Sequence, residues 1–234
     1  MMSRSAFAIS ILAAGCWIEM IRHHTAGEHL ASDPSALTLA GDFLPWMAMV
    51  GAMMLPITIP AVDDVMRRSY RRRRLIAAME YVVGYMACWG MVGAIFVLLR
   101  LHPRMHDRHL AALGCLLAAL WALLPVRRVW FAQCHRQIPL CPEGWRADWD
   151  AVRQGATHGI PCVKMCWLLM VACGISEHDW VMMIGGAALA VLEKRMFRLN
   201  RAPIVVGSLA LAAWFLAQVA LYPNQHLPPQ SHHH

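Results

Sequence analysis

Seven long apolar runs dominate this chain and restrict what it can fold into. Each is close to the roughly 20 residues that an α-helix needs to cross a bilayer. Hydrophobic residues make up 59% of the 234 residues and charged residues 15%, against about 25% charged in soluble domains. The sequence therefore predicts an all-α transmembrane bundle of about seven spans, forming a single integral membrane domain over residues 1–234. The expected spans are approximately 5–22, 43–62, 76–99, 109–126, 160–176, 180–197 and 204–222.

Prolines and short connections shape several of these runs. The second run contains three prolines, so we expect it to be kinked or broken. The fifth should begin with Pro161 in its first turn, after a cytoplasmic segment 133–157 with a short interfacial helix around Trp145 and Trp149. Only the stretch 176–179 separates the fifth run from the sixth, which predicts a tight helical hairpin. The prolines of the second run are Pro45, Pro56 and Pro60.

Charge is distributed as in a protein oriented by a membrane. The formal charge of +7 comes from basic residues in short clusters between apolar runs, so we expect no nucleic-acid partner. If the N-terminus is cytoplasmic, most of the 21 Lys and Arg residues fall in cytoplasmic segments. Seven spans then place the C-terminus outside. The outer segments hold only Arg22, Arg100, Arg104 and Arg108.

A ladder of sulfur side chains in the fifth run is the main candidate metal site. Read as a helix, it places one imidazole and three sulfur side chains at successive i+4 steps on one face. We expect Cys162 and Cys166 to be paired copper(I) ligands, because soft thiolate and thioether ligands suit copper(I) better than zinc. The alternative is ordinary packing, since Cys and Met are common in buried helices. The ladder is His158, Cys162, Cys166 and Met170, and His158 or Met165 would complete the paired site.

Further candidate ligands lie outside the ladder. Cys134, His135 and Cys141 have the spacing C-H-x5-C, which is not a zinc-finger pattern but precedes the ladder at the same membrane face. Met49 and Met53 are one helical turn apart in the second run. Neutral thioethers bind copper(I) without deprotonation, and the alternative is adaptable packing between helices.

The polar residues within the runs have structural interpretations. Tyr81 and Tyr85 share a helical face, and buried tyrosines usually find hydrogen-bond partners. The Glu-Lys pair at 193–194 is expected to be an interfacial ion pair. Lys164 lies one turn inside its span, where it would snorkel to the surface, bind lipid headgroups, or pair with an acid such as Glu80.

Several motifs together resemble a bacterial family of predicted metal-binding integral membrane proteins, a domain of unknown function. The resemblance covers about 45–200 and implies a helical fold in the bacterial inner membrane and metal binding, with copper as the metal. Where the family pattern has Gly and Cys, this sequence has Lys164 and Met165, which favours softer, exchangeable coordination. The motifs are W-M-A-M-V-G-A-M-M-L-P at 46–56, G-Y-M-A-C-W at 84–89, C-H-R-Q-I-P-L at 134–140, H-G-I-P-C-V-K-M-C-W-L-L-M at 158–170, and E-K at 193–194.

Three functions compete on this sequence. The first is copper(I) binding and transfer through Cys, Met and His ligands, with the lipid bilayer as surroundings and a copper chaperone or membrane subunit as partner. The second is a copper-dependent membrane oxidoreductase, which we rank lower because histidine falls mostly in loops. The third is a structural or assembly subunit in which the sulfur side chains only pack. Metal analysis of the purified protein separates the third function from the other two.

Overall fold

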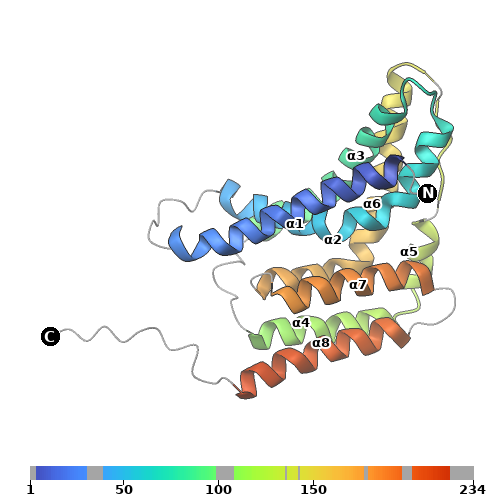
Figure 1. Ribbon diagram of the computed structural model, residues 1–234. Helices are drawn as coiled ribbons and strands as arrows, with labels where there is room; N and C mark the ends of the chain where they lie inside the picture. Colours follow the sequence, from blue (N-terminus) through green and yellow to red (C-terminus); the bar gives the residue numbers. More distant parts are fainter. Residues whose placement is uncertain are drawn as a thin grey trace.

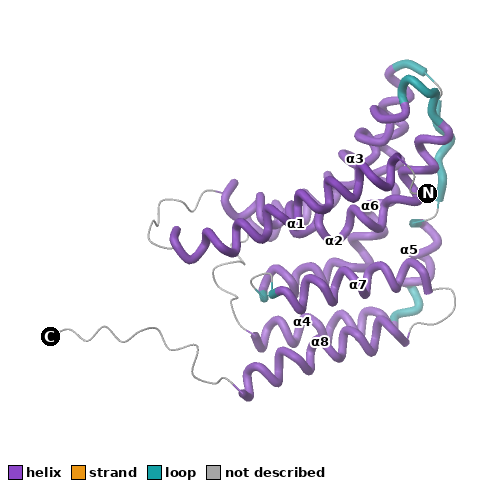
Figure 2. The backbone as a smooth tube through the Cα atoms, in the orientation of Figure 1, coloured by secondary structure: helices purple, strands orange, loops and turns teal. Residues whose placement is uncertain are grey.

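The computed structural model describes residues 4–30, 39–98, 108–134, 136–141, 143–176, 179–196 and 202–221. These residues form helices joined by loops and contain no strand, as expected for the all-α class (Figure 2). The helices are α1 (Arg4–Leu30), α2 (Leu39–Arg68), α3 (Arg74–Leu98), α4 (Arg108–Leu123), α5 (Arg127–Gln133), α6 (Trp145–Ile175), α7 (Trp180–Met196) and α8 (Ala202–Leu221).

The expectation of seven spans is wrong for the described residues. Four helices are long and apolar enough to cross a membrane, namely α2 over Phe43–Arg68, α3, α6 and α8. A fifth candidate is α4 together with α5, but these two helices are bent by 81° at the break between them. The expected sixth span falls short because α7 has 17 residues. The expected first span lies in α1, which is not among these candidates over its described residues.

Two helices continue where the sequence suggested an interruption. α6 runs unbroken for 31 residues, so most of the expected loop 133–157 is helical and Pro161 lies inside the helix. α2 is likewise one helix of 30 residues through its three prolines. Packing supports both, because contacts with neighbouring helices stabilise a helix beyond its local propensity. Next to Pro56, the Thr58 hydroxyl donates to the Leu55 carbonyl at 2.7 Å, so this carbonyl oxygen has a hydrogen-bond partner.

α3 and α6 run parallel and approach each other closely. A Cβ added at Gly84 would lie 2.0 Å from the carbonyl oxygen of Val152, and one at Gly155 would lie 2.0 Å from that of Tyr81. Only glycine allows two backbones to come this near. Through this contact, the N-terminal half of α6 lies along α3. Tyr81 and Tyr85 of α3 thereby contact His158 and Cys162 on the ladder face.

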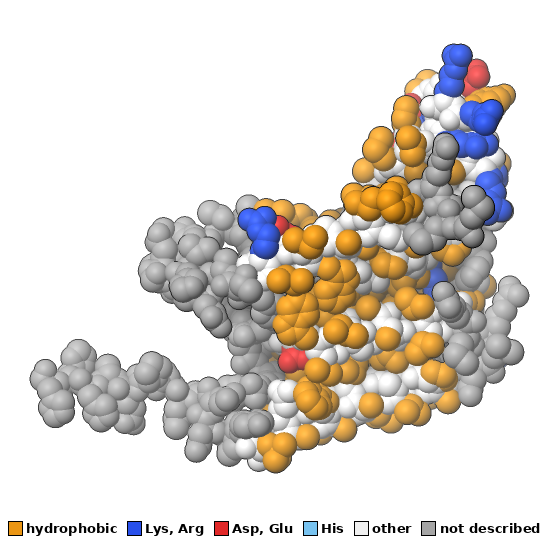
Figure 3. Space-filling model, in the orientation of Figure 1, with side chains coloured by type: hydrophobic (Ala, Val, Ile, Leu, Met, Phe, Trp, Pro, Cys, Tyr) orange, Lys and Arg blue, Asp and Glu red, His pale blue; other side chains and the backbone are white. Residues whose placement is uncertain are grey.

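The remaining helices complete a bundle around α6. Figure 1 shows α4, α7 and α8 lying alongside one another, with α1 and α2 crossing above them. α4 packs on both α6 and α8, α1 packs on α2, and α6 and α7 are in contact as the predicted hairpin. Figure 3 shows hydrophobic side chains over most of this face, while Lys and Arg side chains gather at the end where α3 and α6 begin. Arg67 is exposed in the last turn of α2, and Arg71 and Arg72 are exposed between α2 and α3.

Candidate metal centre

The ladder predicted on α6 faces the interior of the bundle. Cys162, Met165, Cys166 and Met170 are all buried, as their i+4 and i+3 spacing predicts for one face of a helix. The Cys162 and Cys166 side chains line the same small cavity, one helical turn apart. The helix therefore presents a thiol pair of the kind that the sequence predicted.

Four sulfur side chains line one small cavity, which we call the sulfur cavity. Its volume is about 10 Å³, enough for a single water or ion. Cys134 arrives from the end of α5, and its Sγ lies 4.0 Å from the Sδ of Met165. Two segments far apart in the chain thus converge here. The lining residues are Ile57, Phe131, Cys134, Cys162, Met165, Cys166, Ala190, Glu193 and Lys194.

His158 occupies the ladder face but does not line the sulfur cavity. Its Nδ1 lies 2.7 Å from the Tyr81 hydroxyl, and its Nε2 lies 3.0 Å from the Arg136 carbonyl oxygen. With the proton assigned to Nε2, the ring accepts from Tyr81 and donates to Arg136, so both nitrogens are used. Both ring nitrogens are therefore hydrogen bonded in this structure, and a ligand role for His158 stays a prediction. Tyr85 makes the neighbouring contact, with its hydroxyl 3.0 Å from the Cys162 Sγ.

A buried glutamine holds the chain segment that follows Cys134. Gln154 accepts a hydrogen bond from the Ile138 amide at 2.7 Å and donates to the Arg136 carbonyl at 3.1 Å. Arg68 also donates to the Ile138 carbonyl at 3.0 Å. These bonds tie the extended segment to α6 and α2 and thereby keep Cys134 at the sulfur cavity.

The remaining predicted ligands of the α5–α6 connection do not reach this centre in the described structure. His135 lies outside the described residues. Cys141 is exposed, and its amide donates to Asp150 at 3.0 Å, on the outside of α6. Of the two described cysteines in the expected C-H-x5-C group, the structure brings Cys134 to the ladder and leaves Cys141 exposed.

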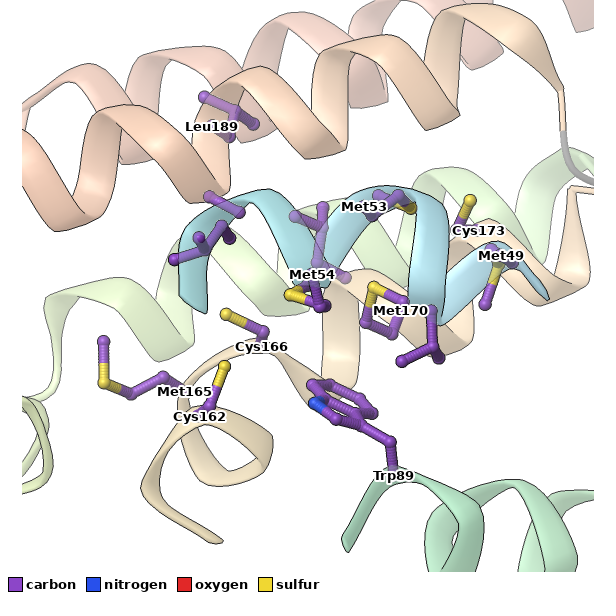
Figure 4. Close-up of a cluster of buried hydrophobic side chains, with 14 of the residues drawn as sticks. Met49, Met53, Met54, Trp89, Cys162, Met165, Cys166, Met170, Cys173 and Leu189 are labelled. Carbon is purple, nitrogen blue, oxygen red and sulfur yellow. The ribbon is translucent and has the colours of Figure 1, made fainter. Parts of the chain in front are cut away.

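The methionines of α2 divide between different neighbours. Met49 and Met53 are fully buried, but Met53 packs on α7, where its Cε would lie 2.7 Å from a Cβ added at Gly186. Figure 4 shows Met54 with its sulfur toward Cys166, while Met49 lies toward the far end of the ladder. Sequence analysis selected Met49 and Met53 and missed Met54. Spacing within α2 could not reveal the rotation of that helix about its axis.

Charged side chains border the sulfur cavity. Glu193 forms a buried ion pair with Arg127 of α5, with Nε and Oε1 2.7 Å apart and side-chain exposures of 5% and 4%. Lys194 donates to the Ile57 carbonyl at 3.3 Å. The expected Glu193–Lys194 pair is therefore wrong, because Arg127 takes the carboxylate. Sequence analysis missed Arg127, which it counted only as part of a basic loop.

Lys164, by contrast, lies on the outside of α6. Its side chain is exposed, and its carbonyl accepts a hydrogen bond from the Trp121 indole at 2.9 Å. Glu80 is paired with Arg73 at 2.8 Å, so it is not the partner of Lys164. The lysine that stands in the ladder motif is therefore directed away from the thiol pair.

A larger open cavity leads to the sulfur cavity. Its volume is about 460 Å³, and it lies between α2, α6, α7 and the segment after α5. The two cavities share Ile57, Cys134 and Lys194. His158 and Asp64 line the open cavity as well. An ion or small complex entering there would meet Cys134 first and the Cys162–Cys166 pair behind it.

Burial determines the protonation state of the Cys134 thiol, which lines both cavities. Loss of solvent raises the pKa of Cys134 to about 12, because an apolar environment disfavours the thiolate. The side chain is therefore a neutral thiol at neutral pH until a cation displaces its proton. Metal binding at Cys134 is consequently coupled to proton release.

The donor set fits copper(I). Among the described residues, no three His, Cys, Asp or Glu side chains form a group that could hold a metal. These residues therefore contain no metal centre built from imidazole, thiol and carboxylate ligands alone. A mixed set of thiols and a thioether is the remaining chemistry, and copper(I) accepts it. Structural zinc instead takes four Cys, His or carboxylate ligands in a tetrahedron.

Comparison with known proteins identifies the family. Neither the curated proteins nor the solved structures gave a match to this chain. A family model named PpoB2 and described as "Copper chaperone" matches residues 43–217, which include α2, the ladder on α6, and the charged residues of α7. The expected resemblance to a copper-related family is confirmed, and the chain belongs to the PpoB2 family of copper chaperones.

Proposed function

We propose that this chain is a membrane protein that binds copper(I) in the sulfur cavity and hands it to an acceptor. The observation that carries the proposal is the convergence of Cys134, Cys162, Met165 and Cys166 on one cavity that continues into an open one. The family description agrees with copper transfer. Copper is the cargo of this protein.

The arrangement of ligands suits transfer better than permanent storage. Cys162 and Cys166 would supply two sulfurs, with the Met165 thioether as the third ligand. Two thiolates around one copper(I) carry a net negative charge, which the Lys194 ammonium at the cavity wall can offset. Cys134 lies at the opening, where it can bind incoming copper first. A second thiol can then replace the ligand that the copper carried when it arrived. Because His158 is already hydrogen bonded on both nitrogens, a copper redox centre has less support than transfer.

Placement in a membrane is part of the proposal. Four helices, or five with the bent pair, have suitable length and composition. Large hydrophobic side chains such as Leu75, Met79, Val83 and Met91 are exposed along one side of α3. Such a surface is costly in water and favourable in lipid. The localisation that we propose is the bacterial inner membrane, with the N-terminus in the cytoplasm and the C-terminus outside.

The orientation can be tested with topology reporters. An external C-terminus requires an odd number of spans, such as the five obtained when α4 and α5 form one span together. A reporter after Leu221 should then be active only outside the cytoplasm. Cytoplasmic activity at this position would overturn the external C-terminus and leave an even number of spans.

The copper site is tested by competition with a chromophoric copper(I) chelator. The double variant Cys162→Ser, Cys166→Ser should lose copper from the sulfur cavity, because serine keeps the shape but removes the soft donor. Cys88→Ser is the matched control, since the Cys88 thiol is buried but donates to the Gly84 carbonyl at 3.5 Å. Equal copper affinity in the double variant and the wild type, both monodisperse in detergent, would refute the proposed site.

A further inference from the structure

A second group of sulfur side chains lies at the other end of the ladder. Cys115 of α4, Cys173 of α6 and Met182 of α7 each have 0% of their surface exposed. The Cys115 Sγ lies 3.7 Å from the Met182 Sδ. We call these three residues the second sulfur cluster.

The fold holds these three side chains together from both sides. A Cβ added at Gly114 would lie 2.8 Å from the Cβ of Ala172, so α4 and α6 approach each other at the residues next to the two cysteines. At the start of α7, the Asp179 carboxylate accepts from the amides of Val181 and Met182 at 2.8 and 3.2 Å. This N-cap fixes the first turn of α7 and with it the position of Met182.

We propose that the second sulfur cluster is a separate copper(I) site. Two thiols and a thioether from three helices form a soft donor set, and no histidine or carboxylate is needed for copper(I). One thiolate neutralises the charge of one copper(I), so the loaded cluster is neutral and tolerates full burial. The other thiol and the thioether bind as neutral donors. The displaced thiol proton leaves to solvent as copper arrives.

A row of sulfur side chains connects this site to the sulfur cavity. Along α6, Met170 follows Cys166 by four residues and precedes Cys173 by three. Figure 4 shows Met170 between Cys166 and Cys173, with Met49 of α2 beside Cys173. The rise from Cys162 to Cys173 is about 16 Å at about 1.5 Å per residue. The second site therefore lies deeper along the same helix, where copper released from the sulfur cavity can be held.

Copper stoichiometry tests the second site independently of the sulfur cavity. Reduced, detergent-purified protein should bind two copper(I) ions, and Cys115→Ser, Cys173→Ser should bind one. The variant Cys162→Ser, Cys166→Ser should also bind one, and Cys88→Ser should bind two. X-ray absorption of the variant lacking Cys162 and Cys166 should show sulfur neighbours only, because the remaining site contains no nitrogen or oxygen donor.

Each outcome decides between the two sites. Unchanged stoichiometry and affinity in Cys115→Ser, Cys173→Ser would overturn the second site, as would a Cys115–Cys173 disulfide found by mass spectrometry in protein purified under reductant. Copper lost from that variant but kept by Cys162→Ser, Cys166→Ser would support the second site and refute the proposed function of the sulfur cavity. If the double variant does not fold, Met182→Leu keeps the volume and should weaken one site at least tenfold. Unchanged affinity in Met182→Leu would overturn the proposal.

Discussion

The two sulfur groups of this chain differ in their surroundings, although both are built on the same face of α6. The sulfur cavity borders Lys194 and the Arg127–Glu193 ion pair, and it opens into a cavity of about 460 Å³. The second sulfur cluster lies between three tightly packed helices, and all three of its side chains are fully buried. Similar ligands are thus placed in a charged, accessible environment at one end and an apolar, enclosed one at the other.

This difference indicates how one helix can bind copper in two ways. Access and nearby charge favour rapid ligand exchange, because an incoming complex can reach Cys134 and the ammonium of Lys194 can balance a second thiolate. Enclosure without a nearby opening favours slow release. We therefore expect the sulfur cavity to load first and the second sulfur cluster to hold copper longer. The following predictions begin with the largest effect.

Removing the buried ion pair beside the sulfur cavity should lower the free energy of unfolding far more than a conservative change at the second sulfur cluster. Arg127→Met leaves the Glu193 carboxylate buried without its partner, and such changes cost about 3–5 kcal/mol. Met182→Leu is the contrasting variant, for which a volume-conserving swap costs less than about 1.5 kcal/mol. Denaturant unfolding of both proteins in detergent measures the difference. Equal losses of stability would mean that the ion pair is not the main support of the charged end.

Substitutions that push neighbouring helices apart should affect the sulfur cavity and the second sulfur cluster differently. Gly155→Ala places a Cβ 2.0 Å from the Tyr81 carbonyl oxygen, so α3 and α6 must move apart, which costs about 1–3 kcal/mol or more. Copper binding in the sulfur cavity should then weaken, because the Tyr85–Cys162 contact depends on this approach. Gly114→Ala meets Ala172, whose Cβ lies at 2.8 Å and whose Cα lies at 3.4 Å, and should chiefly affect the second sulfur cluster. Chelator competition on each variant would contradict this if both changes weakened the same site.

Charge at the cavity wall should tune only the accessible site. Lys194→Met removes the ammonium that offsets a second thiolate, and we expect about tenfold weaker copper(I) binding there, equal to about 1.4 kcal/mol. Lys194→Arg keeps the charge and should restore most of the affinity. The affinity of the second sulfur cluster should not change in either variant. Weakening of both sites by Lys194→Met would show that the two sites are not electrically separate.

The exposed thiol on the loop provides the reference for thiol access. A hydrogen bond with Asp150 raises the pKa of Cys141, because the carboxylate favours the protonated thiol. Alkylation of Cys141 should therefore increase with pH up to a midpoint above that of an ordinary cysteine. Asp150→Asn should shift the midpoint down. Peptide mapping after maleimide labelling should also show Cys141 reacting before Cys134, and Cys115 last. Early labelling of Cys115 would contradict the enclosure of the second sulfur cluster.

Much of the centre could be predicted from sequence because helical spacing is local information. The positions of Cys162, Cys166 and Met170 on one face follow from 3.6 residues per turn, and burial of that face follows from its apolar neighbours. The copper-related family also followed from local motifs. The number of spans did not, because the apolar runs gave no sign that α4 and α5 bend by 81° or that α7 has only 17 residues.

By itself, the sequence determined the helical class, the ladder face of α6 and the soft chemistry of its ligands. Tertiary structure alone decided which other side chains join that face. The position of Met54 near Cys166 depends on the rotation of α2, and the pairing of Glu193 with Arg127 depends on where α5 lies relative to α7. Both ring nitrogens of His158 are hydrogen bonded because Tyr81 and Arg136 reach them. The physical reason is that spacing along a helix sets which side chains share a face, while the partners of that face come from distant segments brought near by packing.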